Sequence, residues 1–301
     1  MRRWALICIV ALLTVASTAC GGTSGGGDIV VTTNILGDVV RNVVGDSAAV
    51  RVLMKPNADP HSFGVSAQEA AAMSSAGVII YNGLGLEENV IRNVESAAEQ
   101  GIPTLAVGDH INPIRYAEGD SMGVPDPHFW TDPQRMIAAV DAIEEAIVGE
   151  VEGIDADALS RNAEAYREEL RELDASMVQR LSTIPADRRK LVTNHHVLGY
   201  FAQRFGFAVI GAIVPSGTTL AAPSSSDLQS LVGAIESAGV PAIFVDSSQP
   251  ERLARVLAED AGVQVQIVPL YSESLSPPGT SGATYLDMMR ANIEAIVTGL
   301  R

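Results

Sequence analysis

The chain has 301 residues, with 36 acidic and 20 basic side chains and a formal net charge of −16 at pH 7. Binding to nucleic-acid phosphates needs clustered lysine and arginine, so this acidity argues against a nucleic-acid partner. A single hydrophobic core rarely grows beyond about 250–300 residues, so the length favours two domains, each with a core of its own.

The N-terminus has the layout of an export signal. Arg2 and Arg3 precede an apolar run, residues 5–15, that is too short to span a bilayer stably. Small residues then lead to Cys20, an arrangement that resembles a bacterial lipoprotein signal, in which this cysteine becomes the lipidated first residue of the mature chain. We therefore expect a signal peptide at 1–19.

Cys20 is the expected site of lipidation. Cys8 lies in the segment to be removed, so the mature chain can form no internal disulfide. A sole cysteine at the first mature residue is better explained by an anchor than by a reactive thiol. Ser17 stands where the lipoprotein signal usually has an aliphatic residue, which leaves cleavage by ordinary signal peptidase as an alternative. The glycine-rich residues 20–27 are expected to form a flexible tether.

From Asp28 onward, β-branched runs alternate with helical stretches, a pattern that predicts a parallel α/β sheet in each half of the chain. In the first half we expect strands at 29–33, 49–53, 77–81 and 104–107, with helices through 39–44, at 67–75 and at 86–100. In the second half we expect strands at 190–194, 208–213, 242–246 and 265–270, with helices at 197–205, 225–238, 250–261 and 284–300.

Residues 155–181 contain no glycine or proline, and their apolar residues recur at spacings of three and four. This predicts one helix of about 40 Å, longer than a small lobe is wide. We expect it to be a stiff connection between two α/β lobes, each with a parallel sheet flanked by helices. The expected boundaries are 28–154 for the first lobe, 155–183 for the interlobe helix and 184–301 for the second lobe.

The tripeptide Asp-Pro-His occurs twice in the first half, ending at His61 and at His128, although the whole chain has only five histidines. Proline fixes its own φ and biases the preceding residue toward extended backbone, so each histidine follows a stiff corner. Imidazoles on rigid corners suit a metal site. The alternative is that these histidines are ordinary turn residues.

Two further candidates come from the second half. His195 lies at the end of the strand expected at 190–194, and Glu273 follows the strand expected at 265–270. Open α/β sheets bind ligands beyond the carboxyl ends of their strands, so two residues from each lobe would place a metal in the cleft between the lobes. Successive strand residues face opposite ways, so only one of His195 and His196 should reach the site. Glu273 could instead be a loop carboxylate of an acidic protein.

Three imidazoles and one carboxylate suit tetrahedral Zn²⁺, although Mn²⁺ or Fe²⁺ would accept the same residues. Asp59 and Asp126 each lie two residues before a histidine and are candidates to orient its ring through the second ring nitrogen. Asp-Pro is also ordinary turn chemistry, which is the alternative for both. His110 is expected at the surface or paired with an acid.

Four segments resemble the metal-binding receptors of zinc and manganese ABC importers, the bacterial cluster A solute-binding lipoproteins. The segments are 54–63, 126–133, 192–201 and 270–275, and the similarity covers nearly all of the mature chain. The resemblance implies that His61, His128, His195 and Glu273 are the metal ligands, and it selects His195 over His196. It also implies the two-lobe fold with a long connecting helix, and a membrane permease with its ATPase as partners.

Two departures from the family pattern concern the metal. Many members have aspartate where this chain has Glu273, which is one methylene longer, and the histidine-rich loop of many zinc receptors is absent from residues 117–124. Manganese members often have glutamate at the position of His195, so the histidine here favours zinc.

The expected function is that of an extracytoplasmic, high-affinity receptor for a divalent metal, with zinc favoured, that delivers its cargo to an ABC import permease. We expect a monomer held by its lipid anchor at the outer face of the cytoplasmic membrane, or in the periplasm. The alternatives are a manganese or iron receptor of the same type, a secreted zinc hydrolase with an open coordination position, and an adhesion protein with a structural metal. In the hydrolase, Glu273 would act as the base.

Overall fold

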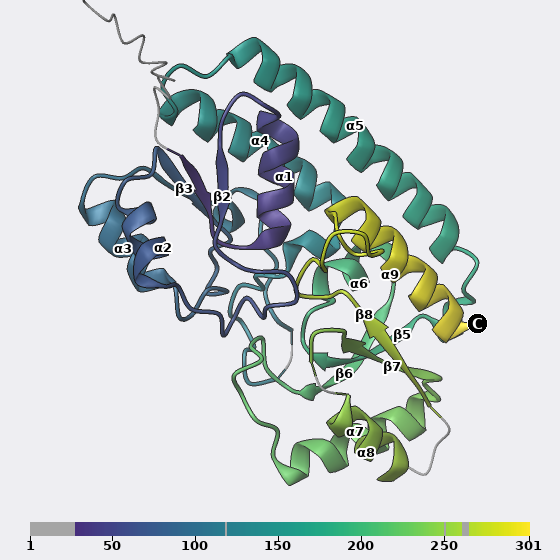
Figure 1. Ribbon diagram of the computed structural model, residues 1–301. Coiled ribbons are helices and arrows are strands. Elements are labelled where there is room, and N and C mark those ends of the chain that lie inside the picture. Colours follow the sequence, from purple (N-terminus) through teal and green to yellow (C-terminus); the bar gives the residue numbers. More distant parts are fainter. Residues whose placement is uncertain (1–27, 118, 250, 261–264) are drawn as a thin grey trace, which may run out of the picture.

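The computed structural model describes residues 28–117, 119–249, 251–260 and 265–301. The expected signal peptide, tether and lipidated Cys20 lie outside these residues. The described chain forms two four-stranded sheets in which every strand pair is parallel, and helices flank both sheets (Figure 1). The α/β architecture predicted from the sequence is confirmed.

The first sheet has the strand order β2-β1-β3-β4. Its strands are β1 (Ile29–Val31), β2 (Val50–Val52), β3 (Val78–Tyr81) and β4 (Thr104–Ala106). The connecting helices are α1 (Asn34–Val44), α2 (Ala67–Met73) and α3 (Ile91–Glu99). Local caps start two of them: Thr33 accepts from the backbone N–H of Leu36 in α1, and Ser66 forms a reciprocal capping box with Glu69 in α2.

Helix α3 is shorter than the sequence indicated. It begins at Ile91, and Glu87 lies in the preceding turn instead of the first turn of a helix. The Glu87 carboxylate is buried and accepts hydrogen bonds from the Thr32 hydroxyl and from the backbone N–H groups of Asn82 and Gly83. These bonds compete with the helical ladder and fix the loop that follows β3.

Two short 3₁₀ turns, η1 (Val107–His110) and η2 (Phe129–Thr131), follow β4. The next element, helix α4 (Pro133–Glu150), was not predicted from the sequence. Its start was readable in the sequence, because Asp132 accepts from the backbone N–H of Gln134 and Pro133 occupies the first helical turn. Helix α5 (Ala156–Leu181) comes next and matches the predicted interlobe helix closely.

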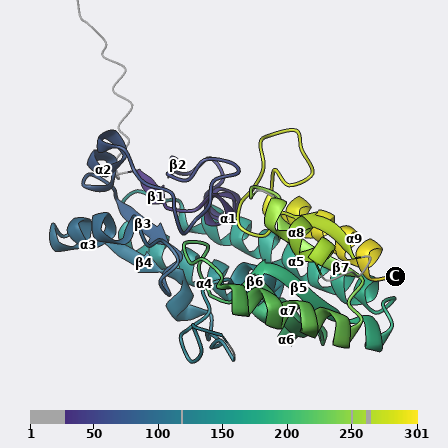
Figure 2. The same ribbon diagram turned by 90° about the horizontal axis from the view of Figure 1, so that it is seen from below.

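The second sheet has the order β6-β5-β7-β8. Its strands are β5 (Lys190–His195), β6 (Ala208–Val214), β7 (Ala242–Asp246) and β8 (Gln266–Leu270), and its helices are α6 (Gly199–Phe205), α7 (Ser225–Ala238), α8 (Arg252–Asp260) and α9 (Tyr285–Leu300). A 3₁₀ turn, η3 (Ala186–Arg188), precedes β5. In Figure 2, helices α2 and α3 lie at one end of the molecule and the second sheet lies toward the other.

Helix α5 packs against α1 and α4 of the first half and against α9 of the second (Figure 1). Its buried face includes Leu159, Tyr166, Leu170 and Leu173. We expected each lobe to bury a core of its own, but the largest apolar cluster is continuous and includes residues of both sheets. Smaller clusters lie under α2 and α3 and under α7 and α8. Within the described residues, no helix combines the length and apolar character that a membrane crossing requires.

Candidate metal centre

The four predicted ligands come together between the two sheets. His61 lies in the turn after β2, His128 directly precedes η2, His195 is the last residue of β5, and Glu273 follows β8. One ligand atom from each lies within 4.8 Å of those from the other three. Each of the four residues is at most 1% exposed. The strand ends of both lobes therefore build one buried cluster.

The spacing of the ring nitrogens fits a small tetrahedral ion. Nε2 of His128 lies 3.3 Å from Nε2 of His61 and 3.4 Å from Nε2 of His195. Around a metal with bonds of about 2.0–2.1 Å, tetrahedral geometry separates neighbouring donor atoms by about 3.3–3.4 Å. The two nitrogen separations that involve His128 therefore match those around a tetrahedral zinc ion.

The Glu273 carboxylate completes the cluster. Its Oε1 lies 3.0 Å from Nε2 of His195 and 3.6 Å from Nε2 of His128, and its Oε2 lies 3.9 Å from Nε2 of His61. Neither oxygen has a partner in hydrogen-bonding geometry, although both are buried. The His195 ring, at 3.0 Å, is the nearest group that could offset the cost of burying this carboxylate, and a cation among the four residues would offset it more fully.

Both Asp-Pro-His corners contain the same local hydrogen bond. Asp59 accepts from the backbone N–H of His61 at 2.9 Å, and Asp126 accepts from that of His128 at 2.9 Å. Each aspartate thus closes a turn two residues long, which places the following imidazole at the tip of a fixed loop. The repeated tripeptide marks a repeated local structure.

The two aspartates differ in what else they contact. Asp126 Oδ1 lies 2.8 Å from Nδ1 of His128, the position from which a carboxylate orients a metal-bound imidazole. Asp59 does not occupy that position at His61. Its Oδ2 accepts from the Thr219 hydroxyl at 2.6 Å and from the Gln249 amide at 3.3 Å, both in the second lobe. The expectation that Asp59 orients a ring is corrected: it joins the two lobes.

Asp246, at the end of β7, was not among the predicted site residues. Its buried carboxylate accepts from the backbone N–H groups of Ser272 and Glu273 at 3.2 and 3.1 Å, and from the Ser272 hydroxyl at 2.6 Å. It therefore fixes the backbone that carries the Glu273 ligand candidate. An acidic residue after a buried strand is the same signal that identified Glu273, and it could have identified Asp246.

The first lobe also holds the Glu273 loop. The Asn34 amide donates to Ser274 Oγ at 2.8 Å and accepts from the backbone N–H of Leu275 at 2.9 Å. The indole N–H of Trp130 donates to the backbone carbonyl of Ser272 at 2.9 Å. Side chains of one lobe thus position a ligand candidate of the other.

Burial sets the protonation of the cluster. It lowers the pKa of His61 to about 2, assisted by the neighbouring His128 and His195, and it lowers the pKa of His128 well below its usual value. Burial raises the pKa of Glu273 to about 7, against the opposing effect of His195. Burial disfavours the charged form of His195 as well, but the Glu273 carboxylate outweighs it and raises that pKa. Two imidazoles are therefore held neutral, and the other pair shares a proton near neutral pH.

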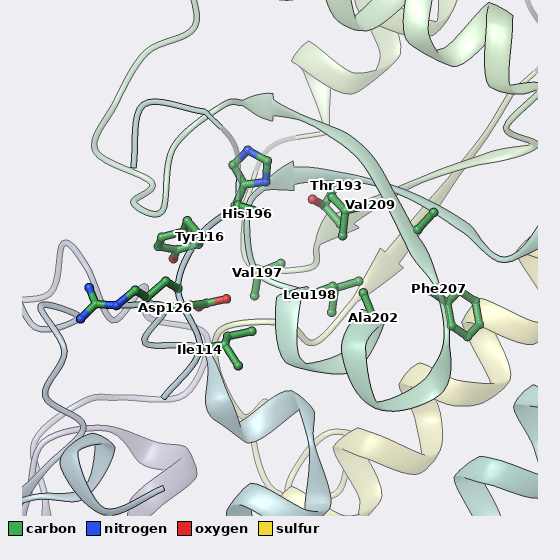
Figure 3. A pocket seen from close by; sticks show the side chains of 14 residues that line it. Ile114, Tyr116, Asp126, Thr193, His196, Val197, Leu198, Ala202, Phe207 and Val209 are labelled. Atoms are coloured by element: carbon green, nitrogen blue, oxygen red, sulfur yellow. The ribbon is translucent and has the colours of Figure 1, made fainter. Parts of the chain in front are cut away.

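A cavity of about 410 Å³ lies beside the cluster, between residues of both lobes. Of the predicted site residues, Asp126 lines it and the four ligand candidates do not (Figure 3). His196 also lines this cavity, in keeping with the expectation that it faces away from His195. His110 is exposed at the end of η1.

Comparison with known proteins identifies the family of the chain. The model of the family described as the periplasmic component A of the zinc-uptake complex matches residues 29–299. The chain belongs to this family. The resemblance inferred from the four sequence segments is thereby confirmed.

Members of this family with different named metals are similarly close to the chain. The zinc-binding protein TroA of Treponema pallidum is 31% identical over 100% of this chain and 99% of its own length. The manganese-binding lipoprotein MntA of Bacillus subtilis is 31% identical over 99% of this chain and 100% of its own. The iron-binding protein YfeA of Yersinia pestis is 29% identical over 99% of this chain and 96% of its own. The solved structure of the Treponema protein superposes with a TM-score of 0.83 over 92% of this chain and 99% of that one.

Proposed function

We propose that this chain is an extracytoplasmic receptor for a divalent metal, with zinc preferred, and that His61, His128, His195 and Glu273 are its ligands. The observation that carries the proposal is the Glu273 carboxylate, which is buried and whose close polar neighbours at the cluster are three imidazole nitrogens, with His195 the nearest at 3.0 Å. A cation bound by all four residues would remove the cost of burying that charge.

The donor set supports zinc over manganese. Three imidazoles, with Nε2 of His128 lying 3.3 and 3.4 Å from the Nε2 atoms of the other two, suit a tetrahedral ion, whereas manganese prefers more oxygen donors and a higher coordination number. Overall similarity does not separate the metals, because relatives named for zinc, manganese and iron have 29–31% identity to this chain. The proposal therefore depends on the local geometry.

The same geometry disfavours a zinc hydrolase. A catalytic zinc keeps one position open for water, with a base beside it. Here the Glu273 oxygens lie 3.0–3.9 Å from the three Nε2 atoms, close enough for Glu273 to be the fourth ligand. A fourth protein ligand would leave no open position in a tetrahedral site. Each of the four residues is at most 1% exposed, so a substrate would have no access. A receptor without catalytic activity fits this site better.

Membership of this family supports a proposal for delivery and attachment. We propose that the monomeric receptor is anchored through lipidated Cys20 and passes its metal to an ABC permease driven by a cytoplasmic ATPase. Relatives named as lipoproteins support the anchor. Replacing Cys20 by serine should move the protein from the membrane fraction to the soluble fraction and abolish fatty-acid labelling. A labelled, membrane-bound Cys20→Ser variant would contradict the anchor.

Binding and transport are tested together. Purified protein should bind one zinc per chain, manganese should compete only in large excess, and His128→Ala should lose tight binding. Deletion of the gene should impair growth under zinc limitation, with rescue by wild type and not by His128→Ala. Metal-dependent hydrolysis of a peptide or ester would favour the enzyme instead. Unimpaired growth of the deletion strain under zinc limitation would contradict the transport role.

A further inference from the structure

The second ring nitrogens of the three histidines are treated unequally. Nδ1 of His128 lies 2.8 Å from Asp126 Oδ1 and 3.1 Å from the Tyr116 hydroxyl, whereas Nδ1 of His195 lies 3.1 Å from the side-chain amide nitrogen of Asn194, which is a hydrogen-bond donor. Nδ1 of His61 is buried without a partner. Metal-bound imidazoles almost always donate this N–H to an acceptor, which fixes the tautomer and the ring. His61 therefore lacks an expected contact.

One carboxylate lies in a position to supply it. Glu88 Oε1 is 3.8 Å from Nδ1 of His61, and the Glu88 side chain is 40% exposed. The gap exceeds hydrogen-bond distance by about 1 Å, which a change of side-chain rotamer can cover. Asp59, the nearer aspartate in sequence, is engaged by the backbone of His61 and by Thr219.

Glu88 is held from the opposite lobe. The Thr218 hydroxyl donates to Glu88 Oε1 at 2.5 Å, and the Thr219 hydroxyl donates to Asp59 Oδ2 at 2.6 Å. Two adjacent threonines of the second lobe thus bind the two carboxylates that flank His61. They belong to a loop after β6, residues 215–220, which we call the strap.

The strap has further ties to the first lobe. The backbone N–H of Gly217 donates to Ser121 Oγ at 3.0 Å, and the backbone N–H of Asp120 donates to the Pro215 carbonyl at 3.1 Å. Four of the strap residues therefore make contacts with the first lobe, and two of these contacts go to the carboxylates that flank His61. Separation of the lobes at this edge would break them together.

We propose that Glu88 is the positioning residue of His61 and that the strap holds it there, an inference that rests on the proposed metal-receptor function. Glu88 accepts the Nδ1 proton of His61, which directs the Nε2 lone pair to the metal and increases its basicity. Because Thr218 fixes the same carboxylate oxygen from the other lobe, displacement of the strap frees Glu88 and weakens the His61 ligand. Strap opening is then coupled to metal release.

The test compares zinc affinity and zinc dissociation, measured by chelator competition, for Glu88→Ala, Glu88→Gln and Thr218→Val. Glu88→Ala should weaken binding about 10–100-fold, and Glu88→Gln should recover most of that loss because its amide oxygen still accepts from Nδ1. Thr218→Val should speed dissociation, with little added effect in the Glu88→Ala background. Glu99→Ala, an exposed glutamate of α3, is the charge-matched control and should bind as wild type does.

A spectroscopic readout separates positioning from a general loss of structure. Histidine ¹⁵N–¹H correlation spectra of the zinc-loaded protein should show a protonated Nδ1 at His61 in wild type and in the Glu99→Ala control, and a changed Nδ1 resonance in Glu88→Ala. Normal zinc binding by wild type with unchanged affinity and unchanged His61 signals in Glu88→Ala would overturn this inference alone. Failure of wild type to bind zinc would overturn the proposed function, and the inference with it.

Discussion

The Asp246 carboxylate accepts a hydrogen bond from the backbone N–H of Glu273, with 3.1 Å between the nitrogen and Oδ2. The same oxygen holds both the backbone and the hydroxyl of Ser272. Asp246 thus fixes the backbone position from which the Glu273 side chain extends toward the proposed site. Glutamate is longer than aspartate, so the position of its backbone decides whether it reaches the metal.

Asp246→Asn should therefore weaken zinc binding without removing a ligand. The amide keeps one acceptor oxygen and loses the charge, so we expect a loss of about 10–100-fold, typical of residues that position metal ligands. Isothermal titration with a competing chelator measures it. Asp187→Asn, an exposed aspartate of η3, is the matched control. Equal affinity in the two variants would show that Asp246 has no part in the site.

Gly199 permits the Asp126 carboxylate to reach His128. A Cβ at residue 199 would lie 2.5 Å from Asp126 Oδ2, closer than real contacts allow. Gly199→Ala should push the carboxylate from its 2.8 Å contact with Nδ1 of His128 and weaken zinc binding by about tenfold or more. Gly233→Ala is the control, because a Cβ there meets open space. Wild-type affinity in Gly199→Ala would indicate that the His128 ring needs no orienting partner.

Acidification should weaken zinc binding, because zinc must displace one proton from the metal-free site. The raised pKa of Glu273, about 7, means that the metal-free site takes up a proton as the pH falls through 7, and zinc must displace it. The pKa of His195 is raised by the charged Glu273, so that effect is lost once Glu273 is protonated, and the pair binds one proton between them. His61 and His128, with lowered pKa values, stay neutral in this range.

We therefore expect the zinc affinity to be level above pH 7 and to fall about tenfold per pH unit from pH 7 to 5. Competition titrations across pH 5–8.5 measure the slope, with a chelator whose own protonation is known. A fall of about a thousandfold per unit would mean that three imidazoles take up protons. In Glu273→Gln the fall below pH 7 should largely disappear, because the titrating carboxyl is gone.

The shared core predicts that the two lobes unfold together. Leu170 of α5 is fully buried in the apolar cluster that includes both sheets. Leu170→Ala should lower the free energy of unfolding by about 2–5 kcal/mol, in one transition reported alike by fluorescence and circular dichroism. Glu169→Ala, exposed on the same helix, should change it by less than about 0.5 kcal/mol. Two separate transitions would indicate independent lobes.

The ligand candidates were readable in the sequence because each follows a strand or a stiff proline corner, features with local signatures. The environment of each ring was not readable. Asp59 and Asp126 occupy identical tripeptides, yet Asp126 contacts its ring and Asp59 contacts Thr219, which is 160 residues away. Such differences arise from packing between the lobes, which cannot be predicted from the local sequence.

The elements show the same division. Helices α5 and α7 were predicted within a residue of their ends, since strong periodicity or capping residues define them. Glu87 was assigned to a helix because acidic residues favour first turns, but its bonds to Thr32 and Asn82 prevail. Helix α4 was not predicted, although an N-cap aspartate, Asp132, and a first-turn proline, Pro133, indicate its start.

The coordination shell of the purified, zinc-loaded protein tests the central claim most directly. Zinc K-edge X-ray absorption should give four light-atom ligands at about 2.0–2.2 Å, with the multiple scattering of three imidazoles, and no sulfur. In His128→Ala the imidazole count should fall and the stoichiometric binding should be lost. One tightly bound zinc with an unchanged spectrum in that variant would contradict the assignment of the site.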